Sequence, residues 1–141
     1  KLILPNAKVI HCQRNSKDNC LSIFKNLFPV GRIDFAYDLN ETCSYYNIYY
    51  ELMNYWHQIL PEFIYDIKYE NLISNTKEEV QKLLAKCNLS WSDACLNFDQ
   101  NKRPINTASD VQARKKIYSS SVDAWKNFNP YLKEYFVKLK N

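Results

Sequence analysis

Residues 7–28 read AKVIHCQRNSKDNCLSIFKNLF and carry the clearest signal of the fold class. Its first part, residues 7–12, is a short apolar run that predicts a buried strand. Residues 15–16 offer the cap of a helix, and Asp18 supplies an acidic side chain in its first turn. An apolar stripe continues the helix down to Pro29. A strand, a short turn and a helix in this order predict the opening of a βα unit.

The remainder of the chain predicts one more strand among several helices. The expected segments are a loop at 29–37, a long helix from 38 or 40 to 60, a strand at 63–69, a turn at 70–73, a helix at 75–87, short helices near 91–96 and 120–125, a polar stretch at 97–118 and a last helix from 130. The long helix between the two strands makes a parallel pair the expected arrangement. Because two parallel strands alone do not form a stable buried sheet, we expect the C-terminal part of a larger α/β domain.

The composition restricts the kinds of anion site that this chain can build. Gly31 is its single glycine, which excludes a glycine-rich phosphate loop within these residues. Residues 1–32 hold six basic side chains and one acidic, residues 33–79 hold two basic and nine acidic, and residues 80–141 hold eleven basic and five acidic. Two basic ends around an acidic middle favour a local anion site over a broad nucleic-acid surface. The alternative is that the charge blocks mark solvated helix faces.

The cysteines and histidines give no reason to expect a metal site. Five cysteines occur without CxxC spacing, and His11 and His57 lie far apart in the sequence. His11 lies inside the first predicted strand, where a core role is expected. Reduced thiols in a cytoplasmic protein are the expected state, with a Cys87–Cys95 pair as the alternative in an oxidising compartment. No apolar run is long enough for a transmembrane span.

Three side chains occupy positions where α/β proteins bind ligands. Arg14 follows the first predicted strand, Ser22 lies in the second turn of the next helix, and Tyr69 ends the second predicted strand. Ligands of open α/β sheets bind beyond the carboxyl ends of the strands. An arginine there can bind a phosphate through two parallel hydrogen bonds. The structural alternatives are a helix-start ion pair for Arg14, a neutral helix position for Ser22 and a core position for Tyr69.

The segments LPNAKVIHCQRNSKDNCLSIF, IKYENLI and NKRPINTASDVQARKKIYSSSVDAW begin at residues 4, 67 and 101. In order and spacing they resemble the P-loop sulfotransferases, in particular the branch of protein-tyrosine sulfotransferases and bacterial domains fused to tetratricopeptide repeats. The resemblance implies that residues 1–141 are the C-terminal portion of a single three-layer P-loop-type domain, with a parallel sheet flanked by helices. It also implies possible tetratricopeptide repeats upstream in the full-length chain.

Such enzymes transfer a sulfuryl group from 3′-phosphoadenosine 5′-phosphosulfate (PAPS) to a hydroxyl or amine acceptor, without a metal. By this resemblance, Arg14 and Ser22 bind the 3′-phosphate and Tyr69 lies against the nucleotide. The late loop of residues 109–118 folds over the 3′-phosphate and adenine, through Ser109, Gln112, Arg114 and Lys115. The 5′-phosphosulfate loop and the catalytic base are expected upstream of Lys1, so the isolated fragment is expected to be inactive.

Three other functions remain open from the sequence. A small-molecule kinase of related P-loop architecture would use similar anion-binding residues. A non-catalytic interaction module would use the aromatic stripe of residues 45–60 to bind a partner. A nucleic-acid binder would use the basic ends, although the acidic middle and the absence of a nucleic-acid motif count against it.

Overall fold

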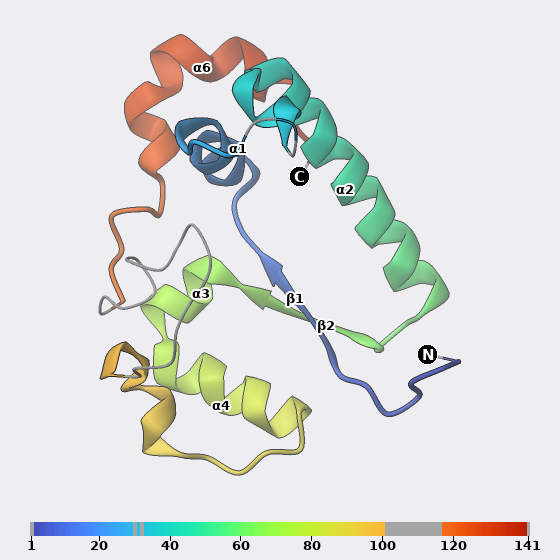
Figure 1. Cartoon of the computed structure of the whole chain (residues 1–141). Helices are drawn as coiled ribbons and strands as arrows, with labels where there is room; N and C mark the ends of the chain where they lie inside the picture. The colour runs from blue at the N-terminus through green and yellow to red at the C-terminus, as the bar shows by residue number, and fades with distance from the viewer. Residues whose placement is uncertain (1, 30, 32, 101–116, 141) are drawn as a thin grey trace. The chain divides into compact units, whose positions relative to one another are not determined.

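The computed structural model describes residues 2–29, 31, 33–100 and 117–140. The chain divides into two compact units, Lys1–Gln13 with Tyr65–Ser119 and Arg14–Ile64 with Ser120–Asn141. Strands β1 (Val9–Gln13) and β2 (Ile64–Lys68) are neighbours in a two-stranded parallel sheet (Figure 1). The expected parallel pair and the α/β class are therefore confirmed.

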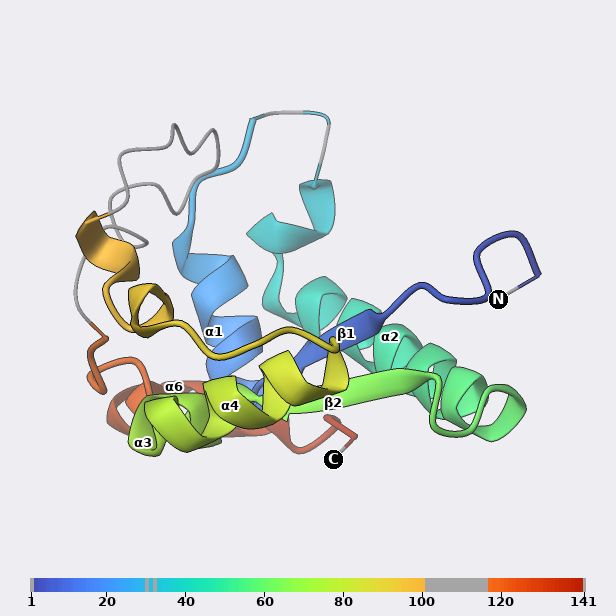
Figure 2. The same ribbon diagram turned by 90° about the horizontal axis from the view of Figure 1, so that it is seen from below.

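In the first unit, helices follow β2 without a long connection (Figure 2). Helix α3 spans Tyr69–Ser74 and helix α4 spans Thr76–Lys86. The turn predicted at 70–73 is therefore wrong. A helix of six residues is too short to display the periodic apolar stripe that identifies longer helices. Two single-turn 3₁₀ helices follow, η2 (Asp93–Cys95) and η3 (Phe98–Gln100), in place of the short helix predicted near 91–96.

The second unit contains the longest helix of the described residues and most of the core. Its elements are α1 (Ser16–Lys25), the 3₁₀ helix η1 (Asp34–Tyr37), α2 (Leu39–Ile59), the 3₁₀ helix η4 (Ala124–Phe128) and α6 (Asn129–Phe136). Asn15 caps α1, because its side-chain oxygen accepts hydrogen bonds from the backbone N–H groups of Lys17 and Asp18. Helix α1 ends at Lys25, earlier than its apolar stripe suggested. The segment predicted as a loop at 29–37 contains η1.

An apolar core joins the helices of this second unit. Its fully buried members come from α1, from the start of α2 and from α6 and the residues after it: Cys20, Leu21, Leu39, Cys43, Phe136 and Leu139. Partly buried side chains pack around them: Tyr46, Trp125, Leu132 and Tyr135. Burial of these side chains supplies the hydrophobic free energy that fixes α1 in the unit. The residues at the start of α1 are therefore held by a packed helix.

The apolar side chains of helix α2 lie partly in the core and partly on the surface. Leu39 and Cys43 are buried, whereas six apolar or aromatic side chains along the helix are exposed: Tyr45, Ile48, Leu52, Tyr55, Trp56 and Ile59. The Tyr45 ring stacks on Phe35 with the ring centroids 4.1 Å apart. Apolar residues three or four positions apart between 39 and 60 predict this helix, but they do not show which side of it faces the core. None of the helices in the described parts of the chain has both the length and the apolar character needed to span a bilayer.

Asp38 caps α2, and its removal should cost measurable stability. Its Oδ1 accepts hydrogen bonds from the backbone N–H groups of Asn40, at 2.7 Å, and Glu41, at 3.1 Å. We expect Asp38→Ala to lower the free energy of unfolding by about 0.5–2 kcal/mol, as for other lost N-caps. Urea denaturation followed by circular dichroism measures this change. Asp38→Asn keeps a capping oxygen and is the matched control; an equal loss in both variants would contradict the capping role.

Candidate functional site

Arg14 lies between β1 and α1, immediately before the Asn15 cap. Its side chain is partly buried, and its Nη2 donates a hydrogen bond to the backbone carbonyl of Ser121 at 2.7 Å. The guanidinium is therefore held against a segment more than a hundred residues away in the sequence. A guanidinium carries several N–H donors in a planar fork, so a bond to Ser121 is compatible with further bonds to an anion.

Asp18 joins the same distant segment to α1. Its carboxylate accepts hydrogen bonds from the backbone N–H groups of Asp123, at 2.7 Å, and Trp125, at 2.9 Å. The side chain of Lys17 lies over the Trp125 ring, with Nζ 4.0 Å from the ring centroid. The first two turns of α1 and residues 121–125 thus form one local structure, which we call the α1 junction.

Ser22 lies one helical turn beyond Asp18. Residues four apart on a helix share a face, so Ser22 continues the face of α1 on which Asp18 lies. Ser22 is partly buried, and its backbone carbonyl accepts a hydrogen bond from Asn26 Nδ2 at 2.8 Å. The two predicted phosphate-binding residues Arg14 and Ser22 therefore belong to the same compact unit.

Tyr69 belongs to the other unit, and the remaining predicted contacts lie outside the described residues. Tyr69 is the first residue of α3, directly after β2, and is partly buried. The expected strand end is thus displaced by one residue. Four predicted donor-binding residues fall in the stretch that the structure does not describe: Ser109, Gln112, Arg114 and Lys115.

A histidine–carboxylate pair lies on the sheet of the first unit. His11 on β1 and Asp66 on β2 are joined by a contact of 2.6 Å between Nδ1 and Oδ1. The His11 side chain is 12% exposed and that of Asp66 is 34% exposed. We expected a core position for His11. The structure instead places His11 at a partly buried position beside the Asp66 carboxylate. The strand pattern of the sequence did not indicate this partner.

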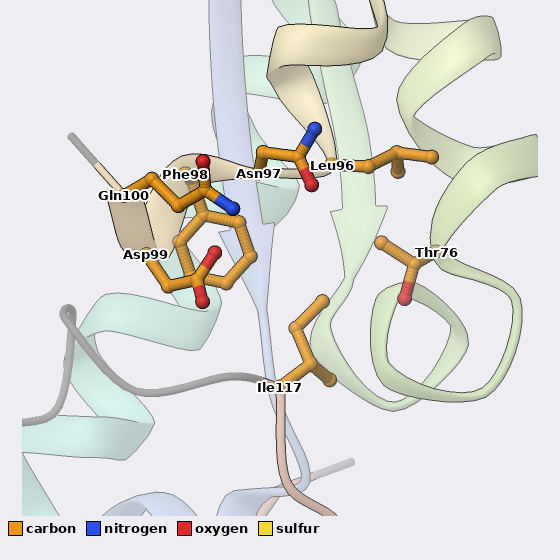
Figure 3. A pocket seen from close by; sticks show the side chains of 7 residues that line it. All are labelled: Thr76, Leu96, Asn97, Phe98, Asp99, Gln100 and Ile117. Atoms are coloured by element: carbon orange, nitrogen blue, oxygen red, sulfur yellow. The ribbon is translucent and has the colours of Figure 1, made fainter.

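The first unit also contains a pocket of about 380 Å³ (Figure 3). Figure 3 shows side chains from the start of α4, from residues 96–100 and from residue 117 around it: Thr76, Leu96, Asn97, Phe98, Asp99, Gln100 and Ile117. The volume lies in the range of small-molecule sites, and the lining combines an aromatic ring with amide and carboxylate groups. None of the described residues predicted to bind the donor lines this pocket.

Cys20 and Cys43 meet inside the core of the second unit. Cys20 is fully buried and Cys43 is 3% exposed. A hydrogen bond with Cys43, together with burial, raises the pKa of the Cys20 thiol far above its ordinary value. The protonated thiol is the poorly nucleophilic form, so Cys20 is a core side chain and not a nucleophile.

Asp18 and Ser121 were not predicted as members of the α1 junction. Asp18 had the ordinary appearance of an acidic residue in the first turn of a helix. Its partners are backbone N–H groups 105 and 107 residues away, and backbone donors leave no side-chain signature in a sequence. The one available signal was the position of Asp18 between Arg14 and Ser22, on the same short segment.

Comparison with known proteins finds a family model that covers helix α1 but not residues 121–125 of the α1 junction. A family model described as "Sulfotransferase family" matches residues 1–93, which include β1, α1, β2 and α4. An uncharacterized protein of Aquifex aeolicus (strain VF5) is 39% identical over 133 residues, covering 93% of this chain. The chain spans 18% of the length of that relative.

Proposed function

The chain belongs to the sulfotransferase family, and from this premise we propose that it binds the 3′-phosphate and adenine side of PAPS. The enzyme that contains it transfers the sulfuryl group to a hydroxyl or amine acceptor. The observation that carries the proposal is Arg14, a partly buried guanidinium between a strand and its following helix. In parallel α/β proteins this junction is where phosphate groups bind.

Charge and hydrogen-bonding chemistry support Arg14 as the main phosphate ligand. Its guanidinium can donate two parallel hydrogen bonds to phosphate oxygens. The bond from Nη2 to the carbonyl of Ser121 restrains the side chain before a ligand arrives. A restrained donor loses less conformational entropy on binding, so the contact contributes more to affinity.

Ser22 is the second proposed ligand of the 3′-phosphate. Its hydroxyl can donate one hydrogen bond to a phosphate oxygen. Ser22 lies on α1 one turn beyond Asp18, on the helix face that carries Asp18. A hydroxyl adds less affinity than a guanidinium, because the hydroxyl group carries no positive charge.

Further donor contacts are proposed for Tyr69 and for Ser109, Gln112, Arg114 and Lys115. Tyr69 follows β2 directly, at the carboxyl end of a parallel strand, where a ring can stack on a purine. From the late loop, Arg114 and Lys115 are the proposed cationic contacts, and Ser109 and Gln112 the proposed neutral ones, for a donor that carries several negative charges.

The chemistry that this donor site supports is positioning. Sulfuryl transfer resembles phosphoryl transfer, in which orientation and charge stabilisation contribute more than covalent assistance. A clamp on the 3′-phosphate is remote from the reacting sulfur, so its binding energy orients the donor for attack by the acceptor.

A comparison of two nucleotides tests the proposal. Isothermal titration of the intact protein with adenosine 3′,5′-bisphosphate and with AMP isolates the contribution of the 3′-phosphate. We expect the bisphosphate to bind at least about tenfold more tightly, since charge-assisted bonds to Arg14 are available only to it. Equal affinities for the two nucleotides would contradict a 3′-phosphate site.

A kinase of related architecture predicts a different result in the same titration. ATP in excess would then displace bound adenosine 3′,5′-bisphosphate, whereas a non-hydrolysable PAPS analogue would not. For a sulfotransferase we expect the reverse order of displacement, because ATP lacks the 3′-phosphate that Arg14 is proposed to bind.

A further inference from the structure

Helix α2 carries apolar side chains on two opposite faces. One face belongs to the core of the second unit through Leu39 and Cys43. Leu52 comes nine residues after Cys43, and 3.6 residues per turn place it half a turn around the helix axis from Cys43. On that side of the helix, five side chains are each between 49% and 63% exposed: Tyr45, Ile48, Leu52, Tyr55 and Ile59. We call these five residues the α2 seam.

The spacing of the α2 seam is typical of a contact between two helices. Its members follow one another at intervals of 3, 4, 3 and 4 residues, as positions a and d do in paired helices. Single exposed apolar side chains are ordinary on a protein surface, whereas a continuous row of them marks an interaction site. The opposite face of α2 is packed in the core, so the helix is already formed when a partner binds.

The order of side chains along the α2 seam fits a second copy of the same helix. Leu52 lies at the centre of the seam, with two members on either side. In an antiparallel pair centred there, Leu52 meets its own copy, Tyr45 meets Ile59, and Ile48 meets Tyr55. Each aromatic ring then lies against an aliphatic side chain, and such alternation of large and small residues fills the space between helices. A two-fold symmetric contact of this kind is the commonest among homo-oligomers.

The charges beside the α2 seam do not oppose such a pair. Glu51 is the one acidic residue between positions 42 and 61, and this stretch contains no lysine or arginine. Pairing centred on Leu52 brings the two copies of Glu51 near each other. Each Glu51 carboxylate forms an ion pair with Lys140 of its own chain. The two ammonium groups therefore offset the repulsion between the two carboxylates.

The two tyrosines of the α2 seam are restrained by neighbouring rings. The Tyr45 ring stacks on Phe35, with the ring centroids 4.1 Å apart. The Tyr55 ring meets Trp56 edge to face, with centroids 5.5 Å apart and planes at 64°. Side chains that are already restrained lose less conformational entropy when a partner covers them.

The exposed area of the α2 seam is of the size that a small dimer interface needs. A whole aromatic side chain buries about 150–250 Å², so five half-exposed side chains offer roughly 450 Å² in each copy and about 900 Å² in a pair. The exposed ring of Trp56 adds to this area. Specific interfaces begin at about 1,000 Å², and obligate ones are much larger. The area thus fits a reversible dimer.

We propose that the α2 seam joins two copies of this chain as an antiparallel helix pair centred on Leu52. The partner is a second copy of the chain, and the contact consists of apolar side chains flanked by Glu51–Lys140 ion pairs. The pairing is independent of donor binding, because no residue of the seam belongs to the proposed donor site.

Sedimentation of the intact protein over a series of concentrations tests the pairing. We expect monomers and dimers in reversible exchange, with a dimer fraction that rises with concentration. Leu52→Glu places two carboxylates opposite each other at the centre of the seam, where like charges repel. This variant should raise the dissociation constant of the dimer by about tenfold or more.

Leu27→Glu is the matched control for the added charge. Leu27 follows α1 in the same unit, lies outside the seam and is 88% exposed. The substitution is of the same type as Leu52→Glu and changes the net charge by the same amount. We expect the dissociation constant of the dimer to stay within about twofold of that of the unchanged protein, since distant exposed charges are screened by salt.

Leu52→Cys decides the matter if Leu52→Glu does not fold. The two introduced thiols face each other in the proposed pair, so oxidised glutathione should convert them to an interchain disulfide, with release of reduced glutathione. A non-reducing gel measures the cross-linked dimer. Leu27→Cys reports the background from the native cysteines and should show no added cross-link.

Four results would overturn the pairing. The first is a monomer at every concentration, including the case in which Leu52→Glu destabilises that monomer because another segment of the intact protein covers the seam. The others are a dimer that Leu52→Glu leaves unchanged, equal effects of the two glutamate variants, and no cross-link above background in Leu52→Cys. All four are measured without nucleotide, so they are distinct from a failure of the proposed donor site.

Discussion

Arg14→Ala should raise the dissociation constant for the PAPS product adenosine 3′,5′-bisphosphate by about ten- to a hundredfold. A hydrogen bond to a charged group contributes about 1.5–3 kcal/mol, and 1.4 kcal/mol corresponds to a factor of ten in affinity. Isothermal titration of the intact protein measures the change. This is the largest effect that we expect from any single side chain of the donor site.

Arg14→Lys separates charge from geometry in the same experiment. Lysine keeps the positive charge but loses the planar fork that binds two phosphate oxygens at once. We expect it to restore only part of the affinity. Full restoration would show that charge alone matters at this position.

Lys25→Ala controls for the change in net charge. Lys25 is exposed in the last turn of α1, with Nζ 5.5 Å from the centroid of the Phe128 ring. Its removal changes the net charge by the same amount as Arg14→Ala. The affinity should then fall by less than about twofold, since exposed charges at a distance are screened by salt. If both variants lose the same affinity, Arg14 has no specific role.

The regular elements could be predicted because their signals are local. Helix α2 begins one residue after an aspartate cap and ends just before Pro61, both of which are visible in the sequence. The βα opening was equally clear from residues 7–28. The helix α3 was missed, because six residues after a strand do not show a helical period. The 3₁₀ helix η1 was missed for the same reason.

For the candidate site, the sequence shows only which residues follow a strand or lie on the next helix. Arg14 follows a strand and Ser22 follows it on a helix, and both relations are readable without coordinates. Asp18 was not predictable as a member of the α1 junction, because its partners lie on the backbone of a segment more than a hundred residues away. Which face of α2 enters the core was also undetermined, since apolar residues occur around most of that helix.

Phe136 is the aromatic side chain that holds α6 in the core of the second unit. It is 4% exposed, and its ring meets Trp125 edge to face, with ring centroids 6.3 Å apart and planes at 87°. Edge-to-face pairs contribute about 0.5–1.5 kcal/mol beyond the area that they bury. We expect Phe136→Ala to lower the free energy of unfolding by about 3–5 kcal/mol, as for other buried aromatic residues. Urea denaturation measures the loss.

Tyr131→Ala on the same helix is the matched control, since Tyr131 is 77% exposed and buries little area. We expect it to change the free energy of unfolding by less than about 0.5 kcal/mol. Native domains are stable by only about 5–15 kcal/mol, so a loss of the size expected for Phe136→Ala removes a large part of the total. The Trp125 ring contacts Phe136, and the Trp125 backbone N–H donates a hydrogen bond to Asp18. Phe136→Ala should therefore also accelerate hydrogen exchange of the Trp125 backbone amide. Equal effects of the two alanine variants would mean that α6 is not held by its buried aromatic face.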